Sequence, residues 1–197
     1  EAKLASVEIA QEKGVFPAFE LSKYATGKAE DMVRNAERTT IAPTGTISMI
    51  FDTSSGIEPW FGTCYKKNIR GGDSLYYINK HLENVLKERG LYSKDLLEQI
   101  YQNRGCVTGI QEIPEDIRRI FQTTFDIPKE HHVKIQAAFQ KHVDNAVSKT
   151  INMPEEATVE EIELLHIEAW KMGLKAVAIY RDNCKVAQPL SGKKRAE

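Results

Sequence analysis

Hydrophobic residues return every three or four positions in several stretches of the chain, and this spacing predicts amphipathic helices. The expected helices cover residues 1–13, 78–89, 93–102 and 129–146. The residues expected on the inner faces of the second and third helices are Leu82, Val85, Leu86, Leu96, Leu97 and Ile100. A shorter helix with a solvated charged face is expected over 30–38, a strand over 61–69, and a turn over 70–73.

The last third of the chain has the clearest succession of element types. Two short apolar runs, 147–152 and 176–179, predict strands. Between them Thr158 and Glu161 form a capping box, and the apolar stripe that follows ends at Gly173. A strand, a helix and a second strand form a βαβ unit with parallel strands, so the sequence predicts an α/β fold.

Residues 39–48 join a short β-branched run to a helix start through Pro43 and Gly45. The pattern predicts a strand, a tight turn and a helix. The first N–H groups of a helix have no partner inside the helix and lie at the positive end of its dipole, so such a turn is suited to binding an anion. The alternative interpretation is an ordinary turn in which threonine hydroxyls only cap the helix. The stretch is not a Walker A loop, because no Gly-Lys-Ser/Thr follows at the required spacing.

Composition and charge narrow the possible partners of the chain. The 197 residues are 41% hydrophobic and 28% charged, which is typical of a globular protein with a sizeable core. Lys and Arg number 27 against 28 acidic residues, so no general attraction to nucleic acid or to an anionic membrane is expected. The apolar runs are shorter than the roughly 20 residues of a membrane-spanning helix, and the N-terminus lacks the features of a signal peptide. A cytoplasmic protein is therefore expected.

The residues most often used in chemistry show no metal or disulfide pattern. Cys64, Cys106 and Cys184 are far apart without a Cys-x-x-Cys pair, so free buried thiols are expected. His131, His132 and His142 do not form a metal set, because adjacent histidines on a helix point in different directions. Glu58 follows a polar loop, and it is interpreted either as an acceptor of backbone N–H groups or as a catalytic carboxylate.

Several motifs spread over nearly the whole chain resemble the carboxy-terminal part of the catalytic chain of ribonucleotide reductases, specifically the adenosylcobalamin-dependent class (class II). The residues that carry the resemblance are Asn35-Ala36 with Ile41-Ala42-Pro43-Thr44-Gly45-Thr46-Ile47-Ser48, Ser55-Gly56-Ile57-Glu58-Pro59, the run from Gln136 to Asn152, and Ala169-Trp170 through Tyr180-Arg181-Asp182. Together these motifs are far more specific than any single turn.

The resemblance implies a fold, a reaction and a binding site. The fold would be the C-terminal half of a ten-stranded α/β barrel over residues 1–185. The polar residues 186–197 are expected, from their own composition, to form a disordered tail. The reaction would replace the ribose 2'-hydroxyl of a ribonucleoside di- or triphosphate by hydrogen, using a cysteine thiyl radical made with adenosylcobalamin. The residues that would hold the substrate phosphates are Pro43, Thr44, Gly45, Thr46 and Ile47. The remaining partner would be the rest of the reductase chain, with no nucleic acid and no membrane.

The chain departs from the reductase pattern at the catalytic residues. The Asn-x-Cys-x-Glu motif that carries the radical cysteine is absent, and no cysteine stands at a position of the radical thiol or the reducing pair. No catalytic residue is therefore assigned, and the chain alone is expected to be inactive. Reductases that import their radical use two adjacent tyrosines on the last strand, whereas here Ile179 precedes Tyr180. Two other interpretations stay open: a stand-alone nucleotide-binding or regulatory module, and a structural half-barrel whose turn binds nothing.

Overall fold

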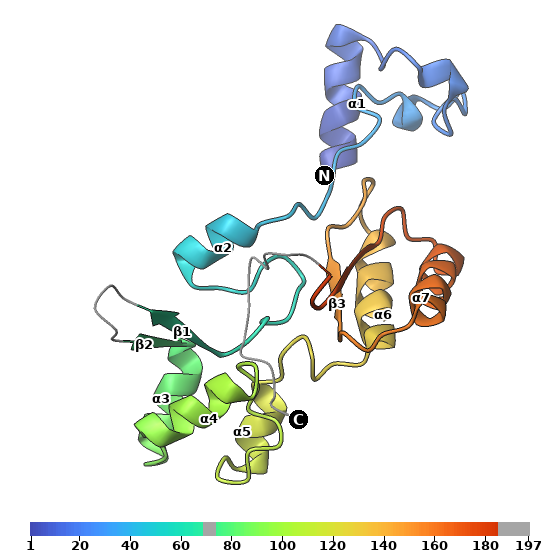
Figure 1. Ribbon diagram of the computed structural model, residues 1–197. Helices are drawn as coiled ribbons and strands as arrows, with labels where there is room; N and C mark the ends of the chain where they lie inside the picture. Colours follow the sequence, from blue (N-terminus) through green and yellow to red (C-terminus); the bar gives the residue numbers. More distant parts are fainter. Residues whose placement is uncertain (69–73, 185–197) are drawn as a thin grey trace.

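The computed structural model describes residues 1–68 and 74–184 (Figure 1). The turn expected over 70–73 and the tail expected over 186–197 lie outside these residues. In chain order the elements are α1 (Ala2–Lys13), the 3-10 turns η1 (Phe19–Leu21) and η2 (Ala29–Asp31), α2 (Gly45–Phe51), β1 (Cys64–Asn68), β2 (Ser74–Ile78), α3 (Lys80–Glu88), α4 (Lys94–Gln102), α5 (Glu115–Ile120), α6 (Lys129–Gln140), β3 (Thr150–Met153), α7 (Val159–Lys171) and β4 (Ala178–Arg181). No helix in the described ranges is long and apolar enough to cross a membrane.

The described strands form two small sheets and do not close a barrel. β3 pairs with β4 in parallel, with Thr150 opposite Ala178, and β1 pairs with β2 as an antiparallel hairpin. Ahead of β3, Val147 makes a parallel bridge with Ile41. The parallel βαβ unit is therefore confirmed, and the strand expected over 39–42 is reduced to one bridge. The expected half of a ten-stranded barrel is not seen as such, because the described parallel sheet has only two strands.

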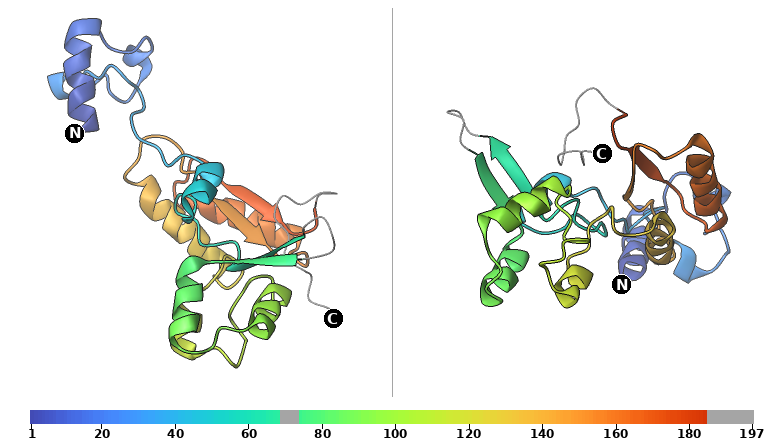
Figure 2. Two further views of the ribbon diagram at one scale, coloured as in Figure 1. Left: turned by 90° about the vertical axis from the view of Figure 1, so that its left-hand side faces the viewer. Right: turned by 60° about the horizontal axis from the view of Figure 1, so that its bottom comes forward.

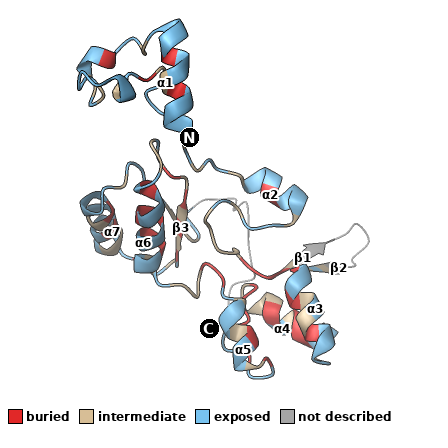
Figure 3. Cartoon of the chain, turned by 180° about the vertical axis from the view of Figure 1, so that it is seen from behind, coloured by how far each residue is buried: buried red, intermediate tan, exposed pale blue. Residues whose placement is uncertain are grey.

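The βαβ unit has its own hydrophobic core. On β3, Ile151 and Met153 are buried, and α6 and α7 lie beside the sheet (Figure 1). Val133 of α6 and Leu165 of α7 belong to the same buried cluster as these two residues. Thr158 caps α7 as predicted: its side chain accepts the N–H of Glu161, and the Glu161 carboxylate accepts the N–H of Thr158. In Figure 3 α6, which carries several buried residues, lies beside β3, while α2 is almost wholly exposed.

A second core lies under the β1–β2 hairpin, among α3, α4 and α5. Five of the six residues expected inside α3 and α4 are buried, and Val85 packs against them half-buried. Residues 74–78 form a strand that the helical pattern did not predict. The helix begins only at Lys80, because the side chain of Asn79 accepts the N–H groups of His81 and Leu82 and so caps α3 there.

The N-terminal residues form a separate unit that projects from the rest of the chain (Figures 1 and 2). The helix expected over 30–38 is wrong, since only the turn Ala29–Asp31 forms. Beyond it the backbone bonds to α1 instead of to itself: the Arg34 N–H donates to the Ser6 carbonyl, and the Asn35 N–H to the Ser6 hydroxyl. Arg38 then ties this unit to the βαβ unit through its bidentate ion pair with Asp144.

Helix α6 is shorter than its apolar spacing predicts, because it ends at Gln140 instead of near residue 146. The Gln140 side-chain amide donates to the carbonyls of Val143 and Asn145. These bonds hold the chain in a turn that brings Val147 beside Ile41. A side chain therefore ends this helix, at a position where the local sequence favours its continuation.

The capping box of α7 should contribute measurably to stability. Thr158→Ala leaves the Glu161 N–H without its acceptor, so the free energy of unfolding should fall by about 1 kcal/mol. Chemical denaturation of the 197-residue chain measures the change. Thr108→Ala, at an exposed loop position, is the matched control and should change stability by less than about 0.5 kcal/mol. Equal losses in the two variants would contradict the role of the cap.

Candidate functional site

The candidate site is the turn between Ile41 and α2. Thr44 is the N-cap residue of α2, and the helix begins at Gly45, so the predicted turn and helix start follow the Ile41 bridge in the predicted order. Gly45, Thr46 and Ile47 are exposed. Within the described residues, none of their N–H groups has a hydrogen-bond partner. The turn therefore offers three neighbouring backbone donors at the positive end of a helix.

The Thr44 hydroxyl does not cap the helix. Instead, its Oγ1 accepts the N–H of Gly56 at 2.9 Å and lies 3.1 Å from the Ser55 hydroxyl. Pro43 has no N–H, so it can shape the turn but cannot donate to a ligand. The cap-only interpretation of the threonines therefore does not describe Thr44, whose side chain ties the turn to the loop over 53–58.

Glycine at position 45 leaves open space in front of the turn. A Cβ built there meets no described atom within 4 Å, and its φ lies outside the left-handed region. Gly56 differs, because its φ of +52° is a conformation that favours glycine. The backbone therefore favours glycine at position 56 but not at position 45, where the missing side chain leaves the amides accessible.

Glu58 accepts a backbone N–H, as one of its two interpretations predicted. Its Oε1 lies 2.8 Å from the N–H nitrogen of Thr150, the first residue of β3. Two residues earlier, the Ser148 N–H donates to the Ile41 carbonyl at 2.8 Å. Alternate N–H groups of a strand point to the same edge. Ile41 and Glu58 therefore occupy successive positions on one edge of the strand.

Lys149 lies between these two positions, and its side chain is buried. Its Nζ is 2.7 Å from His132 Nδ1 on α6 and donates to the Thr150 carbonyl at 3.2 Å. His132 Nε2 in turn lies 3.2 Å from the Thr124 carbonyl, which makes Nε2 the protonated nitrogen and Nδ1 the acceptor. Burial, then the Lys149 charge, lowers the pKa of His132. Burial also lowers the pKa of Lys149, against the opposing charge of Glu58.

Lys149 is not among the residues predicted for the site, although one pattern in the sequence identifies it. Along β3 the side chains alternate, and Lys149 has the same parity as the buried Ile151 and Met153. A lysine at an inward position of a strand needs partners. The link from Thr44 to Gly56 had no comparable pattern, since it joins two loop residues.

The cysteines and histidines form no reactive centre in the described ranges. Cys64 and Cys106 are buried, but Cys184 is exposed, which corrects the expectation of three buried thiols. Burial raises the pKa of the Cys64 thiol to about 12, so this thiol is protonated near neutral pH. Of the three histidines, only His132 is buried. No group of three potential metal ligands occurs among the described residues.

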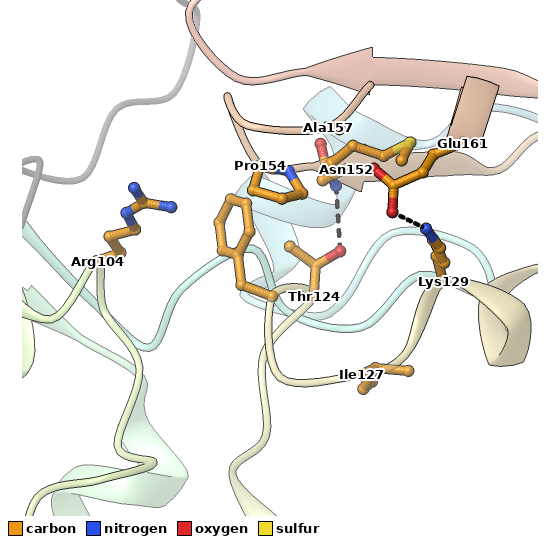
Figure 4. Close-up of a pocket in the computed structure, with 10 residues that line it drawn as sticks. Arg104, Thr124, Ile127, Lys129, Asn152, Pro154, Ala157 and Glu161 are labelled. Carbon is orange, nitrogen blue, oxygen red and sulfur yellow. Dashed lines mark hydrogen bonds and ion pairs between the residues drawn. The ribbon is translucent and has the colours of Figure 1, made fainter. Parts of the chain in front are cut away.

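A cavity of about 300 Å³ lies where β3 ends, between the loop before α6 and the start of α7 (Figure 4). Two pairs of its polar groups bond to each other. Lys129 pairs with Glu161 at 2.6 Å, and the Asn152 amide donates to the Thr124 hydroxyl at 3.2 Å. The guanidinium of Arg104 lies 5.8 Å from the centre of the Phe125 ring. These mutual contacts make the cavity a weaker candidate than the turn, whose donors are unpaired.

The fold is thus α/β, and it carries an exposed turn with the geometry of an anion site. Residues 1–180 match the family described as "Ribonucleotide reductase, barrel domain". The chain belongs to this family. The resemblance noted in the sequence is thereby confirmed.

The similar proteins are longer than this chain. It is 40% identical over 190 residues to a vitamin B12-dependent ribonucleoside-diphosphate reductase of Mycobacterium tuberculosis (strain ATCC 25618 / H37Rv), covering 96% of this chain and 26% of that protein. It is 39% identical over 191 residues to the reductase of the same name from Thermoplasma acidophilum, covering 97% and 24%. The chain therefore spans about a quarter of the length of the curated relatives it matches.

A solved structure supports the fold. The class Id ribonucleotide reductase alpha subunit of Actinobacillus ureae superposes with a TM-score of 0.70 at 25% sequence identity. The superposition covers 91% of this chain and 31% of that one. The arrangement of elements described above is therefore shared with a reductase that is only distantly similar in sequence.

The His132–Lys149 contact makes a prediction about pH. The lowered pKa keeps His132 neutral in the folded chain, while the unfolded chain takes up a proton below about pH 6.5. Stability should therefore fall as the pH drops through this value, by at most about 1.4 kcal/mol per pH unit for one proton. Denaturation of the 197-residue chain between pH 8 and pH 5.5 measures the slope.

His132→Gln should make this slope shallower, since glutamine does not titrate. The matched control is His142→Gln, which changes an exposed histidine and should keep the slope of the unchanged chain. A slope that is the same in all three proteins would show that His132 is not the group responsible.

Proposed function

We propose that this chain is the part of a vitamin B12-dependent ribonucleotide reductase that holds the phosphates of the ribonucleotide substrate. The observation that carries the proposal is the set of three unpaired amides at Gly45, Thr46 and Ile47, in a chain of the reductase barrel family. Backbone donors at a helix start suit phosphate oxygens, and the missing side chain of Gly45 lets a phosphate approach them. An apolar residue such as Ile47 can belong to the site because it contributes only its N–H.

Each of the five residues has a distinct role in this proposal. Gly45, Thr46 and Ile47 donate their N–H groups to phosphate oxygens. Pro43 fixes the direction in which the chain leaves the Ile41 bridge. Thr44 holds the turn against the 53–58 loop through its hydroxyl. The substrate class is a ribonucleoside di- or triphosphate, and the product is the corresponding deoxyribonucleotide.

The radical chemistry is assigned to the remainder of the reductase. The relatives are named vitamin B12-dependent reductases, so we infer adenosylcobalamin as the cofactor of the whole protein, where it would supply the radical. None of the three cysteines of this chain is given a role in that step, because the Asn-x-Cys-x-Glu motif that carries the radical cysteine does not occur in it. The chain alone should therefore bind phosphate groups weakly and have no reductase activity.

The exposed surface of α2 supports a larger parent protein. Met49, Ile50 and Phe51 are each more than 70% exposed, although large apolar side chains are normally covered. Ser48 is the only buried residue of this helix. A reductase in which further chain segments pack on α2 accounts for this surface better than a stand-alone module does.

Gly45→Val tests the phosphate site. The new side chain occupies open space, so the fold should be kept, but it stands in front of the amides. In the full-length reductase the Kd for CDP or CTP should rise about tenfold, a loss of about 1.4 kcal/mol. Isothermal titration calorimetry measures it.

Thr108→Val is the control for that variant, because it adds valine at an exposed loop position away from α2. Its Kd should stay within about twofold of the unchanged protein. Unchanged nucleotide affinity in Gly45→Val, with the fold intact, would mean that the phosphates bind elsewhere.

The radical source makes a separate prediction. On β4, Ile179 packs in the core beside Tyr180, and an aliphatic side chain cannot pass a radical to a tyrosine. The full-length protein, given adenosylcobalamin and a dithiol without a second subunit, should therefore reduce ribonucleotides. Tyr180→Phe should keep most of that activity, measured as deoxyribonucleotide formed. Loss of turnover in a folded Tyr180→Phe protein, or a strict need for a metal-radical subunit, would contradict the cobalamin assignment.

A further inference from the structure

The segment over 41–58 carries the proposed phosphate-binding turn. Its two ends bond to one edge of the chain where it enters β3, at Ser148 and Thr150. At the first end, the Ile41 carbonyl accepts the Ser148 N–H. At the second end, the Glu58 carboxylate accepts the Thr150 N–H. A neighbouring strand would supply these two acceptors from its own backbone, two residues apart. Here the chain turns away at Pro43, and a side chain 17 positions beyond Ile41 supplies the second acceptor.

Inside this segment, a short series of contacts connects Glu58 to the turn. The Glu58 N–H donates to the Ser55 carbonyl at 2.8 Å. The Thr44 Oγ1 in turn lies 3.1 Å from the Ser55 hydroxyl and accepts the Gly56 N–H at 2.9 Å. The turn is thus held to β3 from both ends, directly at Ile41 and indirectly through Thr44 and Glu58.

Helix α2 has little packing of its own with which to hold the turn. It has seven residues, of which only Ser48 is buried, and the Ser48 hydroxyl bonds back to the Gly45 carbonyl of the same helix. Such a short helix does not keep its direction without tertiary contacts. The direction of the three amides therefore depends on the contacts made by Thr44 and Glu58.

The buried Lys149 provides the charge that complements Glu58. Its ammonium group bonds to His132 and to the Thr150 carbonyl, and the Glu58 carboxylate bonds to the N–H of that same Thr150. In the described ranges Lys149 makes no ion pair, so Glu58 acts on it at longer range. A carboxylate is a stronger acceptor than an amide oxygen, so Glu58 holds the Thr150 N–H more firmly than a neutral acceptor would.

We propose that Glu58 is a positioning residue for nucleotide binding, which closes the segment between Ile41 and Thr150 on the edge of β3 and so sets the direction of the Gly45, Thr46 and Ile47 amides. This inference rests on the proposed phosphate site. Glu58 itself does not touch the substrate. Its effect should appear in the binding of the phosphate groups, not in the binding of the nucleoside.

The test uses the full-length reductase and three variants, with CDP, CTP and cytidine as probes. Glu58→Ala removes the acceptor of the Thr150 N–H, and the Kd for the tighter-binding nucleotide should rise about tenfold. Glu58→Gln keeps an oxygen acceptor and should restore binding to within about threefold of the unchanged protein. The Kd for cytidine, which has no phosphate, should stay the same in both. In steady-state assays the loss should raise KM, with kcat at saturation kept within about twofold.

Thr44→Val removes the other contact that holds the turn and changes no bond to β3. It therefore provides a second test if Glu58→Ala does not fold. It removes the hydroxyl that accepts the Gly56 N–H, and it should raise the nucleotide Kd selectively as well. If nucleotide binding is weak in Gly45→Val but normal in both Glu58→Ala and Thr44→Val, the positioning role is wrong while the phosphate site stands. If Gly45→Val binds normally, the phosphate site itself is wrong. If Glu58→Ala weakens cytidine as much as nucleotide, Glu58 supports the fold in general, and the inference is overturned.

Discussion

The need to satisfy the backbone N–H groups along one edge of β3 is the constraint on which the rest of the site depends. An N–H withdrawn from water without an acceptor costs about 1–3 kcal/mol, and the half-buried Ser148 and Thr150 each find an acceptor on that edge. Ile41 supplies a carbonyl to Ser148, and Glu58 supplies a carboxylate to Thr150. Between these two acceptors the chain is free to leave the sheet, and it does so as the turn and the short helix α2.

This constraint explains how the proposed phosphate site can be built on such a small helix. The amides of Gly45, Thr46 and Ile47 are unpaired because they begin a helix, and they are accessible because Gly45 has no side chain. Their direction is set by contacts that lie outside the helix. A reductase must hold a highly charged substrate at a defined distance from its reacting carbon, and backbone donors fixed to a sheet edge meet that requirement without a cationic side chain.

Much of the fold could be predicted from local patterns. The inner faces of α3 and α4, the capping box of α7, the parallel βαβ unit and the helix start at Gly45 follow from periodicity, capping residues and turn residues. The errors have non-local causes. The chain after Asp31 bonds to Ser6 instead of continuing a helix, and the Gln140 side chain ends α6 early.

The candidate site could be predicted only in part, for the same reason. The five residues of the turn followed from their own sequence and from the reductase resemblance. The connections that hold the turn join residues 11 to 92 positions apart, and Lys149 is paired with a histidine on another element, so no local pattern contains them. The resemblance identified the family correctly, but it implied more of a barrel than the described strands form.

Hydrogen–deuterium exchange at the turn tests the central claim most directly. In the full-length reductase, saturating CDP or CTP should slow exchange at the amides of Gly45, Thr46 and Ile47, because phosphate oxygens accept their hydrogens. Saturating cytidine, which lacks the phosphates, should leave exchange at these amides unchanged. Unchanged exchange in the presence of saturating nucleotide, or equal protection by cytidine, would contradict the account.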